Sequence, residues 1–116
     1  MGARLRRRQD FRMVLRAGRR YANRLVALYV LSGGDGPARL GVTTGRRIGT
    51  AVTRNRVRRR LREAYRAHGG ELAPGVDAVL VGRSEAALAD FGCLTGAVLD
   101  VLCRAGLISR EDDARP

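Results

Sequence analysis

One basic segment, residues 51–66, carries the side chains with the clearest chemistry in this sequence. It reads AVTRNRVRRRLREAYR, contains seven arginines and has Glu63 as its only acid. Guanidinium groups form bidentate hydrogen bonds with phosphate oxygens, so a dense row of them suits a polyanion. A merely solvated helix face would mix charges, because opposite charges at i,i+4 stabilise a helix and like charges repel. The segment therefore indicates nucleic-acid binding, with an ordinary solvated face as the alternative.

The same segment keeps an apolar stripe at helical spacing. Leu61 and Tyr65 lie four and eight positions after Val57. At about 100° per residue these side chains share one face of a helix, while arginines fill most of the remaining arc. Thr50, just before the run, is the expected N-cap. We therefore expect a helix that packs one face against a protein core and presents the arginines on the other.

A second candidate surface combines aromatic and basic side chains from the first third of the chain. Phe11 and Leu15 lie in a short predicted helix, and Tyr29 lies in a predicted strand. Single-stranded nucleic acid stacks its bases on such rings and needs cations along its backbone. Core packing is the alternative for these three side chains. The flanking cations of the candidate groove are Arg12, Arg16 and Arg39.

Turn signals and hydrophobic periodicity predict an α+β fold, a small mixed sheet covered by helices in the order helix, strands, helix, strand, helix. The predicted organisation is a basic N-terminal arm over 1–8, one RNA-binding domain over 9–107 and an acidic tail over 108–116. The expected elements are a helix capped by Asp10, a strand over 19–31, a turn over 32–37, an antiparallel return strand over 39–44, the basic helix ended by Gly69-Gly70, a strand over 76–81 after Pro74-Gly75, and a helix over 91–105.

Charge is distributed unevenly over the 116 residues, whose formal net charge is +12. Residues 1–68 hold 19 arginines against three acids, a net of +16, and the remaining residues have a net of −4. The first part of the chain is therefore the expected binding surface. All 23 basic residues are arginines, which a GC-rich genome would also produce, so the choice of arginine over lysine carries little information.

The cysteines, the apolar runs and the N-terminus limit the class of protein to which this sequence can belong. Cys93 and Cys103 have no metal-ligand spacing and are expected to be reduced core residues. The longest apolar run, 25–31, is too short to cross a bilayer, and no signal peptide is visible. The sequence predicts a soluble, cytoplasmic protein with neither a membrane partner nor a small-molecule substrate.

No catalytic machinery is apparent in the sequence. His68 is the only histidine, and the acids of the folded region are scattered singly. The loop at 45–49 has glycines and arginines but lacks the G-x-x-x-x-G-K-[ST] order of a phosphate-binding loop. We therefore predict no catalytic residue, no metal site and no cofactor bound by the protein itself.

The stretch LGVTTGRRIGTAVTRNRVRRRLREAYR, residues 40–66, closely resembles the signature of the bacterial ribonuclease P protein subunit. Its elements are a basic pair before Ile-Gly, then Ala-Val-x-Arg-Asn-Arg, and a basic helix ending Arg-Glu-x-Tyr. The upstream stretch 10–30 resembles the family's Asp-Phe…Gly…Ala-Asn-Arg…Tyr pattern, and residues 77–83 resemble its later strand. The resemblance covers roughly residues 4–107. Two departures are Leu15, where a second aromatic is common, and Thr44-Gly45-Arg46-Arg47, where Val-Ser-Lys-Lys is frequent.

The resemblance implies a function that composition does not reveal. Proteins of this family assist a catalytic RNA that removes the 5′ leader from precursor tRNA in a Mg²⁺-dependent hydrolysis. The implied partners are the ribonuclease P catalytic RNA and precursor tRNA, with the catalytic groups in the RNA. The family fold also implies a left-handed β-α-β crossover around the basic helix. A generic basic RNA-binding or ribosomal-protein-like module, without leader recognition, is the alternative function.

The resemblance also assigns the binding residues. The leader cleft would comprise Phe11, Leu15 and Tyr29, flanked by Arg12, Arg16 and Arg39. The side chains implied to contact the catalytic RNA are Arg46, Arg47, Arg54, Asn55, Arg56, Arg58, Arg59, Arg60 and Arg62.

Overall fold

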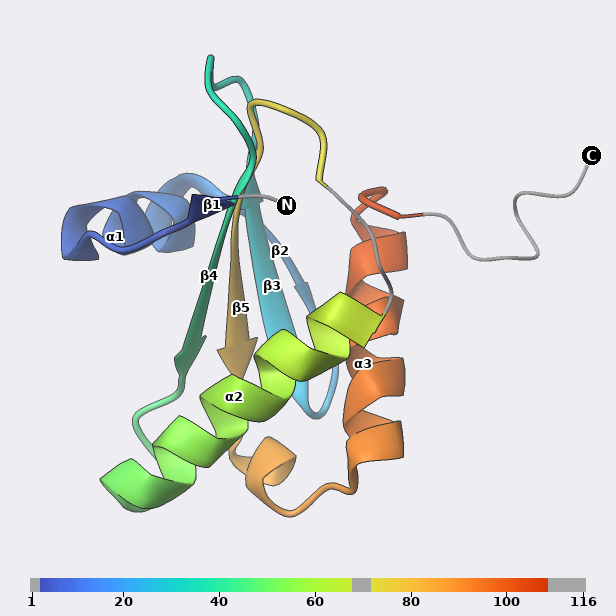
Figure 1. Ribbon diagram of the computed structural model, residues 1–116. Helices are drawn as coiled ribbons and strands as arrows, with labels where there is room; N and C mark the ends of the chain where they lie inside the picture. The colour runs from blue at the N-terminus through green and yellow to red at the C-terminus, as the bar shows by residue number, and fades with distance from the viewer. Residues whose placement is uncertain (1–2, 68–71, 109–116) are drawn as a thin grey trace, which may run out of the picture.

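The computed structural model describes residues 3–67 and 72–108, in which helices pack on both faces of one sheet (Figure 1). Mixed parallel and antiparallel pairing confirms the predicted α+β class. The described elements are β1 (Ala3–Arg4), α1 (Arg8–Ala17), β2 (Arg19–Ala22), β3 (Val26–Leu31), β4 (Arg39–Thr44), α2 (Ala51–Ala67), β5 (Asp77–Gly82), the 3₁₀ helix η1 (Ser84–Ala87) and α3 (Phe91–Arg104).

The sheet has the strand order β1-β4-β5-β3-β2. β4 pairs in parallel with both β1 and β5, whereas β3 pairs antiparallel with β5 and β2. Because α2 lies between the parallel neighbours β4 and β5 in the chain, these three elements form a β-α-β crossover. Its left-handed sense stays an expectation from the resemblance.

Alternation of side chains along the strands gives each sheet face its own core. Leu28 and Leu80 point to the face covered by α2 and α3, where Leu61 packs in the larger core cluster. Val79 points to the opposite face and packs with Val14 of α1 in a smaller cluster. The arginine helix and the first helix therefore lie on opposite sides of the sheet (Figure 1).

Two strand predictions are wrong. The predicted strand over 19–31 is a hairpin of β2 and β3, which residues 23–25 separate. The return strand β4 does not pair with β3, because β5 lies between them. In β5 three consecutive side chains, Ala78, Val79 and Leu80, are fully buried. A strand buried on both faces is favoured at the centre of a sheet, where both of its edges are also paired.

The N-terminal segment also differs from its prediction. Part of the expected arm joins the sheet: β1 pairs with β4, and the Leu5 backbone N–H donates to Leu40 O at 3.1 Å. The Leu5 side chain is only 5% exposed, because it packs between the sheet and α1. α1 begins at Arg8, so Asp10 lies in the first helical turn and does not cap the helix. An acid there still interacts favourably with the helix dipole.

The C-terminal helix confirms the predicted position and corrects one side chain. Asp90 caps α3 by accepting a hydrogen bond from the Cys93 backbone N–H at 2.8 Å. Cys93 itself is exposed, contrary to the core expectation, because the first helical turn points it away from the buried stripe that includes Leu94 and Val98. The Asp90 carboxylate raises the pKa of the Cys93 thiol by hydrogen bonding.

Some predictions fall outside the described residues: His68, the Gly69-Gly70 helix end and most of the acidic tail. The one-domain boundaries at 9 and 107 stay predictions. Among the described residues, no helix has the length and apolarity needed to span a membrane.

Asn23 holds the β2–β3 turn against α3. Its amide nitrogen donates to Ala97 O and to the Asp100 carboxylate, each at 3.0 Å. Its amide oxygen accepts from the backbone N–H groups of Leu25 and Val26, also at 3.0 Å. The side chain of Asn23 thus connects α3 to the residues that begin β3.

We expect Asn23→Ala to lower the free energy of unfolding by about 2–3 kcal/mol, because several half-buried hydrogen bonds are removed together. Chemical denaturation of the two proteins measures the difference. Asn55→Ala on the exposed surface of α2 is the matched control and should cost less than about 0.5 kcal/mol. Equal destabilisation of the two variants would contradict this role of Asn23.

Candidate nucleic-acid interface

The beginning of α2 is fixed by side-chain hydrogen bonds. Thr50 Oγ1 accepts from the Thr53 backbone N–H at 3.2 Å, which confirms Thr50 as the N-cap. Arg54 Nη1 donates to the carbonyl oxygens of Ile48, at 3.3 Å, and Gly49, at 2.8 Å. Arg54 therefore holds the preceding loop in a defined position at the N-terminal end of α2. This loop carries Arg46 and Arg47, both of which are exposed.

The buried face of α2 is the predicted one. Val57, Leu61 and Ala64 are at most 1% exposed and pack on the sheet. Gly82 of β5 allows this close approach, because a Cβ there would lie 2.7 Å from a Val57 methyl carbon. The close packing orients the arginine face of α2 away from the sheet.

The predicted RNA-binding residues of α2 fall into two groups. Arg56 and Arg59 are exposed, as is Asn55, which accepts a hydrogen bond from Arg58. Arg60 instead donates to Ala89 O at 2.7 Å and so joins α2 to the segment before α3. Arg54 and Arg60 therefore stabilise the fold. Of the other five arginines of α2, Arg56, Arg59 and Arg66 are exposed, and Arg58 and Arg62 are half-buried.

A concentrated positive cluster surrounds Arg62, which is half-buried. Burial lowers the pKa of its guanidinium, and the charges of Arg4, Arg58 and Arg66 lower that pKa further. Within the described part of the chain, no carboxylate forms an ion pair with any of these four side chains. The cluster therefore has an uncompensated positive potential.

Two members of this cluster, Arg66 and Arg4, are not among the RNA-binding residues predicted from the sequence. Arg66 lies one helical turn after Arg62, so its position on the same face was available from the spacing. Arg4 had no such signal, because its proximity to α2 depends on the pairing of β1 with β4.

The six predicted leader-cleft residues do not form one lining. Phe11 and Tyr29 are half-buried between α1 and the sheet, in the small core cluster. Gly41 lies directly against Phe11, because a Cβ on Gly41 would be 2.5 Å from ring atom Cζ. Both aromatic side chains therefore contribute to the packing of α1 on the sheet.

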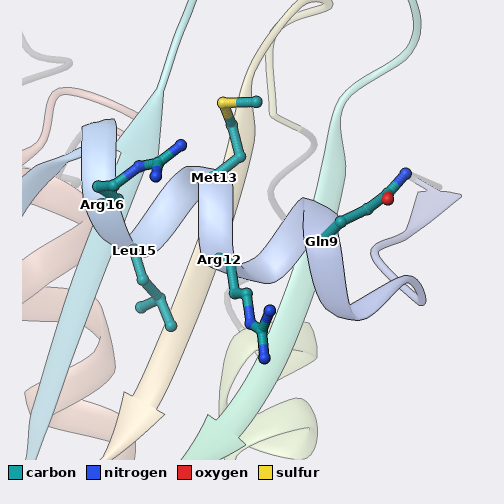
Figure 2. Close-up of a pocket in the computed structure, with 5 residues that line it drawn as sticks. All are labelled: Gln9, Arg12, Met13, Leu15 and Arg16. Carbon is teal, nitrogen blue, oxygen red and sulfur yellow. The ribbon is translucent and has the colours of Figure 1, made fainter.

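The outer surface of α1 carries a shallow hollow of about 580 Å³. Figure 2 shows Arg12 and Leu15 extending to one side of the helix and Met13 to the other, with Arg16 one helical turn after Arg12. Leu15 is 38% exposed, and both arginines are exposed. Three of the predicted cleft residues thus share this hollow, with Gln9 as its remaining lining residue.

Arg39 is held by two carboxylates at the edge of the same sheet face. Its Nε donates to Asp77 Oδ1 at 3.0 Å, and its Nη2 to Asp77 Oδ2 at 2.7 Å. Its Nη1 lies 3.4 Å from Asp10 of α1. The hydrogen bonds with Asp77 raise the pKa of Arg39. This arginine therefore connects α1 to the sheet, and its charge is largely compensated.

Arg20, which is not among the predicted leader-cleft residues, contacts one of the predicted stacking residues, Tyr29. Its Nε donates to the Tyr29 hydroxyl at 3.1 Å, and its guanidinium carbon is 5.9 Å from the ring centroid. The contact follows from the hairpin, which places Arg20 opposite Tyr29. A single strand over 19–31 would not bring the two residues together.

Among the described residues, no group of three or more His, Cys, Asp or Glu side chains could hold a metal ion. What the described residues do provide is a strongly basic helix on one face of the sheet and an aromatic and basic surface on the other. Contacts with phosphates and bases are the chemistry that this arrangement supports.

Comparisons with known proteins agree on one family. The family model described as Ribonuclease P matches residues 2–106. The chain is 35% identical over 104 residues to the "Ribonuclease P protein component" of Clostridium botulinum (strain Loch Maree), covering 89% of this chain and 94% of that protein. It is 34% identical over 106 residues to the protein of the same name from Alkaliphilus oremlandii, covering 91% and 93%.

Solved structures give the same result. The RNase P protein of Staphylococcus aureus matches with a TM-score of 0.77 and 25% identity, covering 92% of this chain and 98% of that one. The RNase P protein from Thermotoga maritima matches with a TM-score of 0.74 and 30% identity, covering 87% and 96%. These similarities extend over the sheet and the helices on both of its faces.

Proposed function

The chain belongs to the ribonuclease P protein family, the protein components of a tRNA-processing ribonucleoprotein, and from this premise we propose how it acts. It binds the catalytic RNA through the arginine face of α2 and the 5′ leader of precursor tRNA through the opposite, α1 side. The RNA carries out the Mg²⁺-dependent cleavage, in the cytoplasm. The protein assists by positioning and charge compensation.

The observation that carries this proposal is the cluster of Arg4, Arg58, Arg62 and Arg66, in which Arg62 is half-buried and none of the four forms an ion pair with a described carboxylate. Bringing precursor tRNA against a second RNA opposes two polyanions, and the repulsion falls when a cationic surface lies between them. In the folded protein α2 and the α1 surface lie on opposite faces of the sheet. This separation supports the proposal, because two RNAs bound on these faces would be held apart by the thickness of the sheet. Holding the leader beside the catalytic RNA also raises the effective concentration of the scissile bond.

Cleavage of precursor tRNA by a bacterial ribonuclease P RNA at low Mg²⁺, with and without the purified protein, tests the proposal. We expect the protein to stimulate cleavage strongly and to cleave nothing when the RNA is omitted. Binding of the RNA without stimulation would favour a generic basic RNA-binding module. Cleavage by the protein alone would contradict the assignment of the catalytic groups to the RNA.

A further inference from the structure

The β2–β3 hairpin places two neighbouring arginines on opposite faces of the sheet. Arg20 pairs in register with Tyr29, and Arg19 pairs with Val30. Directly opposed residues of antiparallel strands point to the same face. Val30 packs against the α2–α3 core, whereas Tyr29 packs in the α1 cluster. Arg20 therefore lies on the α1 face, and Arg19 lies on the other.

The contact with Tyr29 uses only one edge of the Arg20 guanidinium. The Nε–H donates to the Tyr29 hydroxyl at 3.1 Å. The two Nη groups of this exposed side chain form no hydrogen bond with another described residue, and no described carboxylate pairs with it. An arginine oriented through Nε can present its Nη groups to a phosphate at reduced entropic cost.

Charge compensation distinguishes Arg20 from Arg39, the cation that the sequence predicts on β4 beside the leader cleft. Arg39 is bound bidentately by Asp77 and approached by Asp10, so its positive charge is matched locally. Arg20 has no such partner among the described residues and touches an aromatic ring that is half-buried. Aromatic faces next to uncompensated cations are the combination that single-stranded nucleic acid requires.

We propose that Arg20 is a leader-binding residue: the Tyr29 hydroxyl orients its guanidinium, whose Nη groups bind a phosphate of the RNA leader. The assignment rests on the proposed function, because it requires the leader to cross the α1 face. It adds a contact from β2 to the surface that binds the leader. In this assignment Arg20, and not Arg39, supplies the cation that binds a leader phosphate.

The test compares Arg20→Ala with Arg19→Ala in the holoenzyme assembled with a bacterial ribonuclease P RNA. The two variants remove the same charge from adjacent residues of one strand, so they differ only in the face affected. We expect Arg20→Ala to weaken binding of leader-bearing precursor tRNA about fivefold without changing binding of mature tRNA. The salt slope for the leader-bearing substrate should fall by about 0.7, the value of one single-strand phosphate contact. Arg19→Ala should leave the ratio of the two affinities unchanged.

Tyr29→Phe tests the orienting role, because it removes the hydroxyl and keeps the ring. We expect it to reproduce part of the Arg20→Ala effect on the affinity ratio, and the double variant to equal Arg20→Ala alone. Additive effects of the two substitutions would overturn the orienting role of the hydroxyl.

The failure of this assignment is separable from failure of the proposed function. If wild type prefers the leader-bearing substrate while Arg20→Ala and Arg19→Ala behave alike, Arg20 is not a leader contact. If wild type binds both substrates equally, leader binding on the α1 face fails, and the Arg20 assignment fails with it. Thermal unfolding of each variant identifies any loss of affinity that arises from misfolding.

Discussion

Arg62→Glu is expected to weaken binding of the catalytic RNA about a hundredfold while leaving the protein at least as stable as wild type. The loss of RNA affinity and the retained stability have one cause, the positive charges around Arg62. Arg62 is half-buried among the charges of Arg4, Arg58 and Arg66, which repel it in the absence of RNA. A glutamate there would be attracted to the same three arginines but would repel a phosphate backbone.

Two measurements check this expectation. RNA binding as a function of salt should give a shallower slope for Arg62→Glu, since a protein that neutralises fewer phosphates releases fewer counterions. Thermal unfolding should show an unchanged or higher Tm. Arg19→Glu, at the far edge of the sheet from α2, changes the net charge equally and should reduce RNA affinity much less. An equal reduction of affinity in the two variants would mean that net charge, and not the cluster, drives binding.

Gly41→Ala should abolish most of the preference for leader-bearing substrate and destabilise the protein by about 1–3 kcal/mol. The added Cβ would lie 2.5 Å and 2.7 Å from two Phe11 ring atoms and 3.0 Å from the Leu5 Cβ. Phe11 must then move, and α1 moves with it because that ring is part of its contact with the sheet. The α2 surface, on the opposite face, should keep its affinity for the catalytic RNA.

Gly96→Ala is the matched control for this substitution. Gly96 lies within α3, and a Cβ there meets no atom within 4 Å apart from the nearby backbone of α3 itself. Replacing an unhindered helical glycine by alanine should raise stability by about 0.5–1 kcal/mol. Substrate affinities measured in the holoenzyme, for leader-bearing and mature tRNA, complete the comparison. An unchanged preference in Gly41→Ala would contradict the placement of leader binding on the α1 side.

The residues of a leader-binding surface are harder to predict from the sequence than those of the arginine face of α2. Phe11, Leu15 and Tyr29 look equivalent in the sequence, as apolar side chains near arginines. In the fold, Leu15 is on the outer surface of α1, and the two rings pack between α1 and the sheet. Arg39 likewise reads as an available cation, but its carboxylate partners are 29 and 38 positions away in the chain.

Local pattern is sufficient for α2, because helical periodicity, its cap and its charge excess lie within one continuous segment. The stripe of Val57 and Leu61 fixes which face is buried before any partner is known. The same holds for α3 and for β5, whose apolar runs match the structure closely. The family resemblance, too, depends on such contiguous motifs.

Pairing between distant segments is what these local patterns cannot specify. Several strand arrangements would bury the same apolar side chains, and the observed order inserts β5 between β3 and β4. That choice places Asp77 beside Arg39, and the hairpin places Arg20 beside Tyr29. The pairing of β1 with β4 likewise brings Arg4 near Arg62. These contacts arise from long-range packing, so the charge that each arginine presents to RNA depends on the folded chain.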